Sequence, residues 1–156
     1  MKRTVALAIL GVAAATATSA YGQGDVLFSN YAAPYVPIEY SAGLGGGLVG
    51  AGQGVQIEVW AAEGNVAEGG LSFLANANLS AFDGYTVNTQ VFSLPTYTTG
   101  QTWTLQLRAS GDSGGTPVTG AGPLVVTSTI GDQTISPPEL PAFNYTPGFE
   151  VVAVPE

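Results

Sequence analysis

The sequence contains no cysteine and no histidine, and only three of its 156 residues are lysine or arginine. Without cysteine the chain has no disulfide, no thiol nucleophile and no thiolate site for zinc or an iron–sulfur cluster. Without histidine it has no Ser-His-Asp triad, no histidine general base and no histidine ligand for haem. These absences exclude several classes of enzyme and metalloprotein, and we expect no cofactor and no bound metal.

The first 22 residues have the pattern of a secretory signal peptide. Residues 1–3 are basic after the initiator, residues 4–15 are apolar, and residues 16–20 are small, which is the order that such signals follow. The apolar run of about 12 residues is shorter than the roughly 20 that a membrane span needs. We expect signal peptidase to cut after Ala20 or, preferably, after Gly22. The protein would then be exported to the periplasmic side, the outer surface or the medium.

Removal of this leader makes the remaining chain strongly acidic. Lys2 and Arg3 leave with the leader, so Arg108 is then the only base against 11 acidic residues, for a formal charge of −10. Such a chain cannot neutralise phosphate groups, which excludes nucleic acid as a partner. An anionic membrane surface repels it for the same reason. The acidic residues are scattered and form no run, so we interpret them as solvated surface charges.

Residues 23–153 are expected to form one domain with an all-β fold. Residues 53–62 and 101–109 show the clearest alternation between apolar and polar residues in the chain, which is typical of half-buried antiparallel strands. Helix signals are nearly absent, and Thr, Val, Tyr, Phe and Gly predominate. We predict an antiparallel β-sandwich of about seven or eight strands, jelly-roll or immunoglobulin-like. The other expected strands are residues 26–31, 85–94, 124–130 and 149–154, with a strand preferred over a short helix within 67–81.

The remaining segments are predicted to be irregular. Residues 43–54 contain seven glycines in twelve positions and are expected to form a loop. Residues 112–122 are also predicted to be a loop, because they are rich in Gly, Thr, Ser and Pro. Residues 33–40 contain two prolines and are expected to be an edge strand or extended loop. Residues 136–141 are expected to be an extended crossing segment.

The two tryptophans are predicted to face opposite ways. Trp103 falls on the apolar face of its strand and is expected in the core, whereas Trp60 falls on the polar face of residues 53–62 with Gln56 and Glu58. An aromatic ring on such a face, with polar side chains beside it, can stack on a sugar ring. Trp60, Gln56 and Glu58 are therefore the candidate ligand-binding residues. The alternative is that a loop or second sheet covers Trp60.

Catalysis is not expected. Paired carboxylates could serve a glycosidase, but none of the acidic residues lies in a distinctive motif. Calcium needs only oxygen ligands, yet the Asp-x-Asp-x-Asp-Gly pattern of a calcium loop is absent. We therefore predict a non-enzymatic protein, with carbohydrate binding as the alternative function.

Several short motifs resemble those of a known family. Residues 23–30 (QGDVLFSN) match a Gln-Gly-x-(apolar)-x-Phe-x-Asn start with one extra residue, and residues 57–61 (IEVWA) match an apolar-x-apolar-Trp/Tyr-Ala strand. Residues 100–109 (GQTWTLQLRA) match a later strand, residues 137–140 (PPEL) match a Pro-Pro-x-Leu segment, and the last residues are Val154, Pro155 and Glu156. In these features the chain resembles the small β-rich group of exported PEP-CTERM proteins of Gram-negative bacteria.

The resemblance implies a location and a set of partners. In that family a Pro-Glu-Pro motif, an apolar membrane helix and a basic cluster form a sorting signal that an exosortase reads. Residues 154–156 would be the start of this signal, with Pro155 and Glu156 as its first motif residues, truncated before the helix. The resemblance implies signal peptidase and exosortase as partners, and exopolysaccharide as a further one, with the membrane contacted only through the missing helix. The family suggests a cell-surface or extracellular-matrix protein linked to biofilm.

Overall fold

The computed structural model describes residues 24–132 and 140–155 of the chain. Within these ranges the protein is almost entirely β-structure, with two single-turn 3-10 helices and no α-helix. The elements in chain order are β1 (Gly24–Ser29), β2 (Glu39–Tyr40), η1 (Ala42–Leu44), β3 (Val55–Glu63), η2 (Glu68–Gly70), β4 (Ser72–Ala77), β5 (Val91–Leu94), β6 (Trp103–Ser113), β7 (Thr116–Ala121), β8 (Val125–Thr127), β9 (Gly131–Asp132), β10 (Ala142–Tyr145) and β11 (Glu150–Ala153). The all-β prediction is confirmed.

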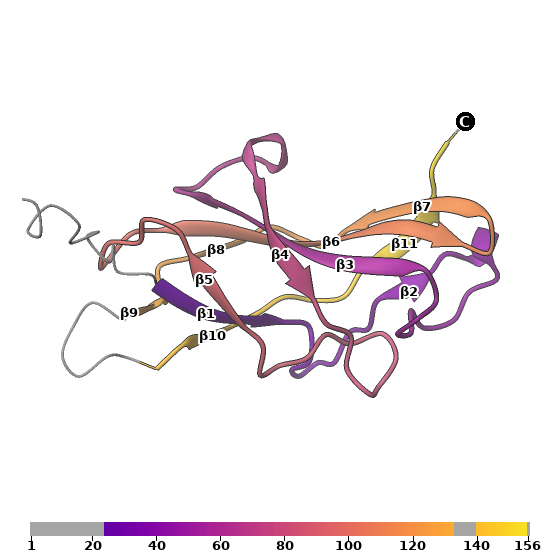
Figure 1. Ribbon diagram of the computed structural model, residues 1–156, viewed down its shortest axis with the longest axis horizontal. Coiled ribbons are helices and arrows are strands. Elements are labelled where there is room, and N and C mark those ends of the chain that lie inside the picture. Colours follow the sequence, from indigo (N-terminus) through magenta and orange to yellow (C-terminus); the bar gives the residue numbers. More distant parts are fainter. Residues whose placement is uncertain (1–23, 133–139, 156) are drawn as a thin grey trace, which may run out of the picture.

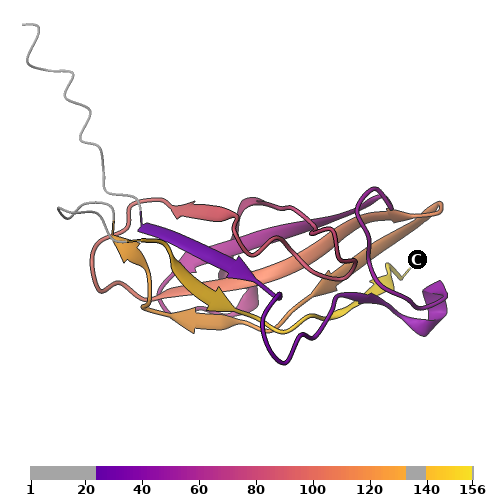
Figure 2. The ribbon, with the colours of Figure 1, turned by 90° about the horizontal axis from the view of Figure 1, so that it is seen from below.

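The strands form two sheets that pack as a sandwich. The smaller sheet has the order β10-β1-β5, with β9 also paired to β1, and the larger has the order β2-β11-β7-β6-β3-β4, with β8 paired to β6. Two pairs, β1–β10 and β2–β11, are parallel, so the sandwich is mixed rather than purely antiparallel. Figures 1 and 2 show an elongated molecule, with the β6–β7 turn at one end and β9 at the other.

A single apolar core lies between the sheets. Val26, Phe28 and Phe92 contribute from the smaller sheet, and the alternating apolar residues of β3 and β6 contribute from the larger. Trp103 is buried among them, as predicted. The period-2 alternation therefore assigned the inner faces of β3 and β6 correctly, because side chains of a strand point alternately to its two faces.

The loop prediction for residues 112–122 is wrong. β6 continues to Ser113, and β7 pairs with it in register through a turn at Gly114 and Gly115, both of which have positive φ. Val118 of β7 is buried, whereas the other five residues of that strand are not, so the segment carries little alternation. The Gly, Thr and Pro content of residues 112–122 resembles that of a loop, although these residues form the β6–β7 hairpin.

Other boundaries also differ from expectation. Only Val91–Leu94 of the predicted strand 85–94 is regular, and β9 and β10 were not foreseen. Residues 33–40 are mostly irregular, with β2 at their end. Residues 1–22, most of the crossing segment 136–141, and Glu156 lie outside the described residues.

Candidate functional site

Trp60 lies on the outer face of the larger sheet, near the middle of β3. The neighbouring side chains Gln56 and Glu58 share this face, because they are an even number of residues away. The indole Nε1–H of Trp60 donates a 2.7 Å hydrogen bond to Glu58 Oε2. Ser110 Oγ of β6 donates a 2.8 Å bond to the other oxygen of Glu58. Both oxygens of this carboxylate therefore hold neighbours on the sheet.

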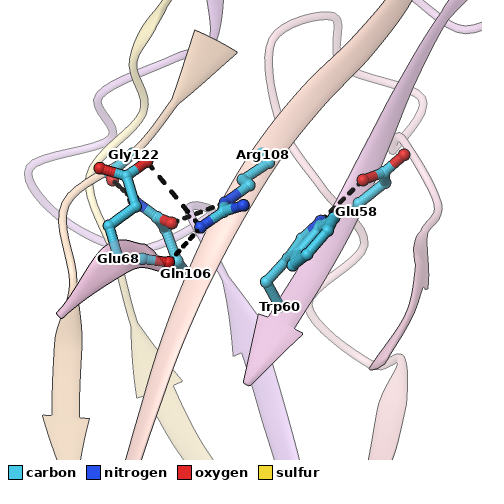
Figure 3. Close-up of polar contacts among 6 residues, drawn as sticks. All are labelled: Glu58, Trp60, Glu68, Gln106, Arg108 and Gly122. Atoms are coloured by element: carbon cyan, nitrogen blue, oxygen red, sulfur yellow. Dashed lines mark hydrogen bonds and ion pairs between the residues drawn. The ribbon is translucent and has the colours of Figure 1, made fainter. Parts of the chain in front are cut away.

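Arg108 covers one face of the Trp60 ring. Its guanidinium carbon lies 4.3 Å from the indole centroid, which is a close cation–π contact (Figure 3). The contact follows from strand register, since β6 pairs with β3 so that Arg108 is opposite Glu58 and Gln106 is opposite Trp60. A sugar that stacked on this indole face would have to displace Arg108.

Three further groups hold the guanidinium in place. Arg108 Nε donates to Gln106 Oε1 at 2.8 Å, and Nη2 donates to the backbone oxygen of Glu68 at 2.8 Å. The Glu68 carboxylate is 3.9 Å from Nη2. Gln106 Nε2 in turn donates to the backbone oxygen of Gly122. Figure 3 shows this chain of contacts running from Glu68 to Glu58 across β6.

The segment between β3 and β4 folds over the outer face and explains why polar residues of β6 are buried there. Thr104 Oγ1 donates to Gly64 O at 2.6 Å and accepts from the Val66 amide at 3.1 Å. Thr104 and Gln106 are consequently almost fully buried, although the alternation placed them on the polar face. Arg108, bonded to Glu68, completes the attachment of this segment.

Gln56 is not brought to Trp60. It is exposed and borders a separate hollow of about 390 Å³ near the end of β3, with Asn76 and Asn78 of the adjacent chain segment. The structure thus joins two of the three predicted binding residues, Glu58 and Trp60, and leaves the third beside a polar hollow. Ligand binding by these residues stays a prediction.

The exposed aromatic surface beside Trp60 belongs to Phe73. This ring, on β4, is 53% exposed and meets the indole at 80° with centroids 6.2 Å apart. Trp60 itself is only half-buried. The arrangement can therefore offer an apolar ring with polar groups nearby, but its polar groups already bind one another.

The other predicted site residues lie apart. Pro155 is exposed just after β11, and the preceding amide of Val154 donates to Pro117 O at 2.9 Å. In the described part of the chain, no three His, Cys, Asp or Glu side chains gather in a group that could hold a metal ion. No helix within those residues is long and apolar enough to cross a membrane.

Arg108 is the participant that sequence reasoning missed. Its position on the polar face of residues 101–109 was visible, but its contact with Trp60 depends on how β3 and β6 are paired.

Compared with known proteins, the chain matches no family model, no curated protein and no solved structure.

Proposed function

We propose that this chain is a non-enzymatic structural protein, a stable β-sandwich that is exported to the cell surface or extracellular matrix. The non-enzymatic part is supported by one observation: the polar side chains on the outer face of the larger sheet bind one another. Arg108, the only base beyond residue 3, binds Trp60, Gln106 and Glu68, and Glu58 binds Trp60 and Ser110. These groups attach a surface segment to the sheet and stabilise the fold.

The export part of the proposal rests on the sequence. Cleavage after Ala20 or Gly22 would leave the whole of β1, which begins at Gly24, in the exported chain. The position of β1 after both cleavage points is consistent with a removable leader, because cleavage would not shorten the central strand of the smaller sheet. The resemblance to PEP-CTERM proteins supports signal peptidase as the first partner and an exosortase as the second.

Export is tested by expressing the full chain in a Gram-negative host and determining the N-terminus of the product by mass spectrometry. We expect the protein outside the cytoplasm, beginning at Gln23 or Tyr21. A matched variant with Ala20→Lys and Gly22→Lys should lose these processed forms, because signal peptidase requires small residues before the cut. A wild-type product that keeps Met1 and remains in the cytoplasm would contradict the proposal.

The sorting part is tested separately by reading the gene beyond codon 156. We expect a third motif residue, then about 20 apolar residues and an arginine-rich end. A stop codon directly after Glu156 would remove the exosortase from the proposal and leave export untouched.

Carbohydrate binding at Trp60 is the second candidate function. It is favoured by the exposed Phe73 ring beside Trp60 and by the Glu58 carboxylate bonded to the indole. It is opposed by Arg108, which occupies an indole face. Phe73→Ala is the variant that tests it, because Phe73 is exposed and makes no hydrogen bond through its side chain. Loss of sugar binding in that variant would support this candidate.

A further inference from the structure

Four aromatic rings gather where the loop after β1 meets the loop before β5. Tyr31 and Phe82 are nearly parallel, with 5° between their planes and centroids 6.0 Å apart. Tyr35 and Tyr85 approach Tyr31 edge-on at 5.7 and 5.4 Å. The two loops lie side by side along the lower edge of Figure 1, below β1 and β4. We call these four residues the aromatic cluster.

A buried asparagine holds the two loops together. Asn30 is fully buried, and its Nδ2 donates to Gly84 O at 2.8 Å and to Val36 O at 3.1 Å. Its Oδ1 accepts from the Thr86 amide at 2.9 Å. Tyr85 adds a bond from its hydroxyl to Tyr35 O at 2.7 Å. The aromatic cluster is thus positioned before any ligand arrives, which lowers the entropy lost on binding.

A hollow of about 270 Å³ opens at this place. Tyr31, Phe82 and Val87 make its lining mostly apolar, and the exposed Asn88 supplies a polar side chain. The hydroxyls of Ser80 and Thr86 also border it, but they bond to neighbouring groups of the loops. Phe82 is 63% exposed, the largest exposed fraction of any phenylalanine among the described residues. Tyr35, which also contacts Tyr31, is 54% exposed, so the aromatic cluster presents a patch of rings rather than a single one. Such exposed apolar patches are typical of binding surfaces.

We propose that the hollow beside Tyr31 and Phe82 binds a pyranose ring of a neutral polysaccharide. One side of a pyranose ring presents C–H groups, which suit the negative face of an aromatic ring, and its edge presents hydroxyls, which suit an amide such as that of Asn88. The lining therefore offers an aromatic face for the C–H groups of a sugar and an amide for its hydroxyls.

Charge argues for a neutral sugar. Asp83 follows Phe82 directly and is exposed, and Arg108, the one base in the described residues, is committed to Trp60 and Glu68. A chain with 11 acidic residues and so few bases repels uronic acids and other polyanions. This site is distinct from Trp60, and its existence does not depend on export.

The test is affinity electrophoresis of the purified chain in native gels that contain soluble polysaccharides. The neutral probes are hydroxyethyl cellulose, galactomannan, arabinoxylan and dextran, and the anionic probe is polygalacturonate. We expect retardation by at least one neutral probe and none by polygalacturonate. Phe82→Ala should weaken binding by roughly tenfold or more, because it removes a stacking surface.

Matched variants keep the result interpretable. Phe143→Ala removes a ring that is 43% exposed on β10, and it should bind as the wild type does. Circular dichroism and urea unfolding of Phe82→Ala should match the wild type, since an exposed ring contributes little to stability.

Three outcomes would overturn the proposal. No retardation by any neutral polysaccharide would show that the hollow is not a sugar site. Binding that is lost in Phe73→Ala but kept in Phe82→Ala would assign the sugar to the surface beside Trp60. Self-association of the wild type in sedimentation velocity, absent in Phe82→Ala, together with no sugar binding, would make the aromatic cluster an interface between copies of the chain.

Discussion

At the scale of single residues, the polar side chains that matter here are those that join segments far apart in the chain. Asn30 binds Val36, Gly84 and Thr86, the last of which is 56 positions away. Because it is buried, its amide atoms cannot exchange these partners for water.

Asn30→Ala should lower the free energy of unfolding by about 3 kcal/mol, because the buried Thr86 amide loses its acceptor and the carbonyls of Gly84 and Val36 each lose one of two donors. Urea denaturation followed by circular dichroism measures this change. Asn65→Ala, at an exposed position in the segment between β3 and β4, is the control and should stay within about 0.5 kcal/mol of wild type. Equal stability of the two variants would refute the role given to Asn30.

At the scale of elements, β3 and β6 form the longest pairing among the described strands and carry the Trp60 and Arg108 contacts. Their pairing runs from Val55 opposite Gly111 to Glu63 opposite Trp103. Just before β3 begins, the backbone of Gly54 comes very close to that of Asp112 near the end of β6. A Cβ at Gly54 would lie 2.3 Å from Asp112 O. Gly54 also has a φ of +79°, which side chains disfavour.

Gly54→Ala should therefore lower the free energy of unfolding by about 3 kcal/mol, from backbone strain and steric clash together. Gly52→Ala is the matched control, because Gly52 has a φ of +80° but open space where its Cβ would lie. It should lose only about 1 kcal/mol, the penalty for the left-handed backbone alone. Thermal or urea unfolding of both variants checks the difference, and similar losses would mean that the close approach is unimportant.

At the scale of the whole molecule, the fold has to tolerate a large excess of negative charge. The chain carries 11 acidic residues and three bases, two of which lie in the first three positions. The parallel pairing of β2 with β11 places Glu39 beside Glu150, and both side chains are exposed. Like charges opposite one another destabilise a sheet.

Glu39→Gln should raise the free energy of unfolding by roughly 0.5 kcal/mol at low ionic strength, since it relieves this repulsion. The gain should disappear in about 1 M salt, where exposed charges are screened. Glu68→Gln provides a control of opposite sign, because Glu68 lies beside Arg108 and its loss should not stabilise the protein. Urea unfolding at two salt concentrations measures both effects. A stabilising Glu68→Gln would contradict this account.

The sequence by itself determined the all-β class and the two faces of β3 and β6, including the burial of Trp103 and the outward position of Trp60. These follow from the alternation of apolar and polar residues, which is a local property of a strand. The hairpin of β6 and β7 escaped detection because few of its side chains are buried and its composition resembles that of a loop.

Only the tertiary structure decided which outward-facing residues meet. Arg108 lies over Trp60 because of the register between β3 and β6, and Tyr31 lies against Phe82 because Asn30 joins two irregular loops. The parallel pairings of β1 with β10 and of β2 with β11 were equally hidden. Register and loop contacts depend on segments far apart in the chain, and no local periodicity records them.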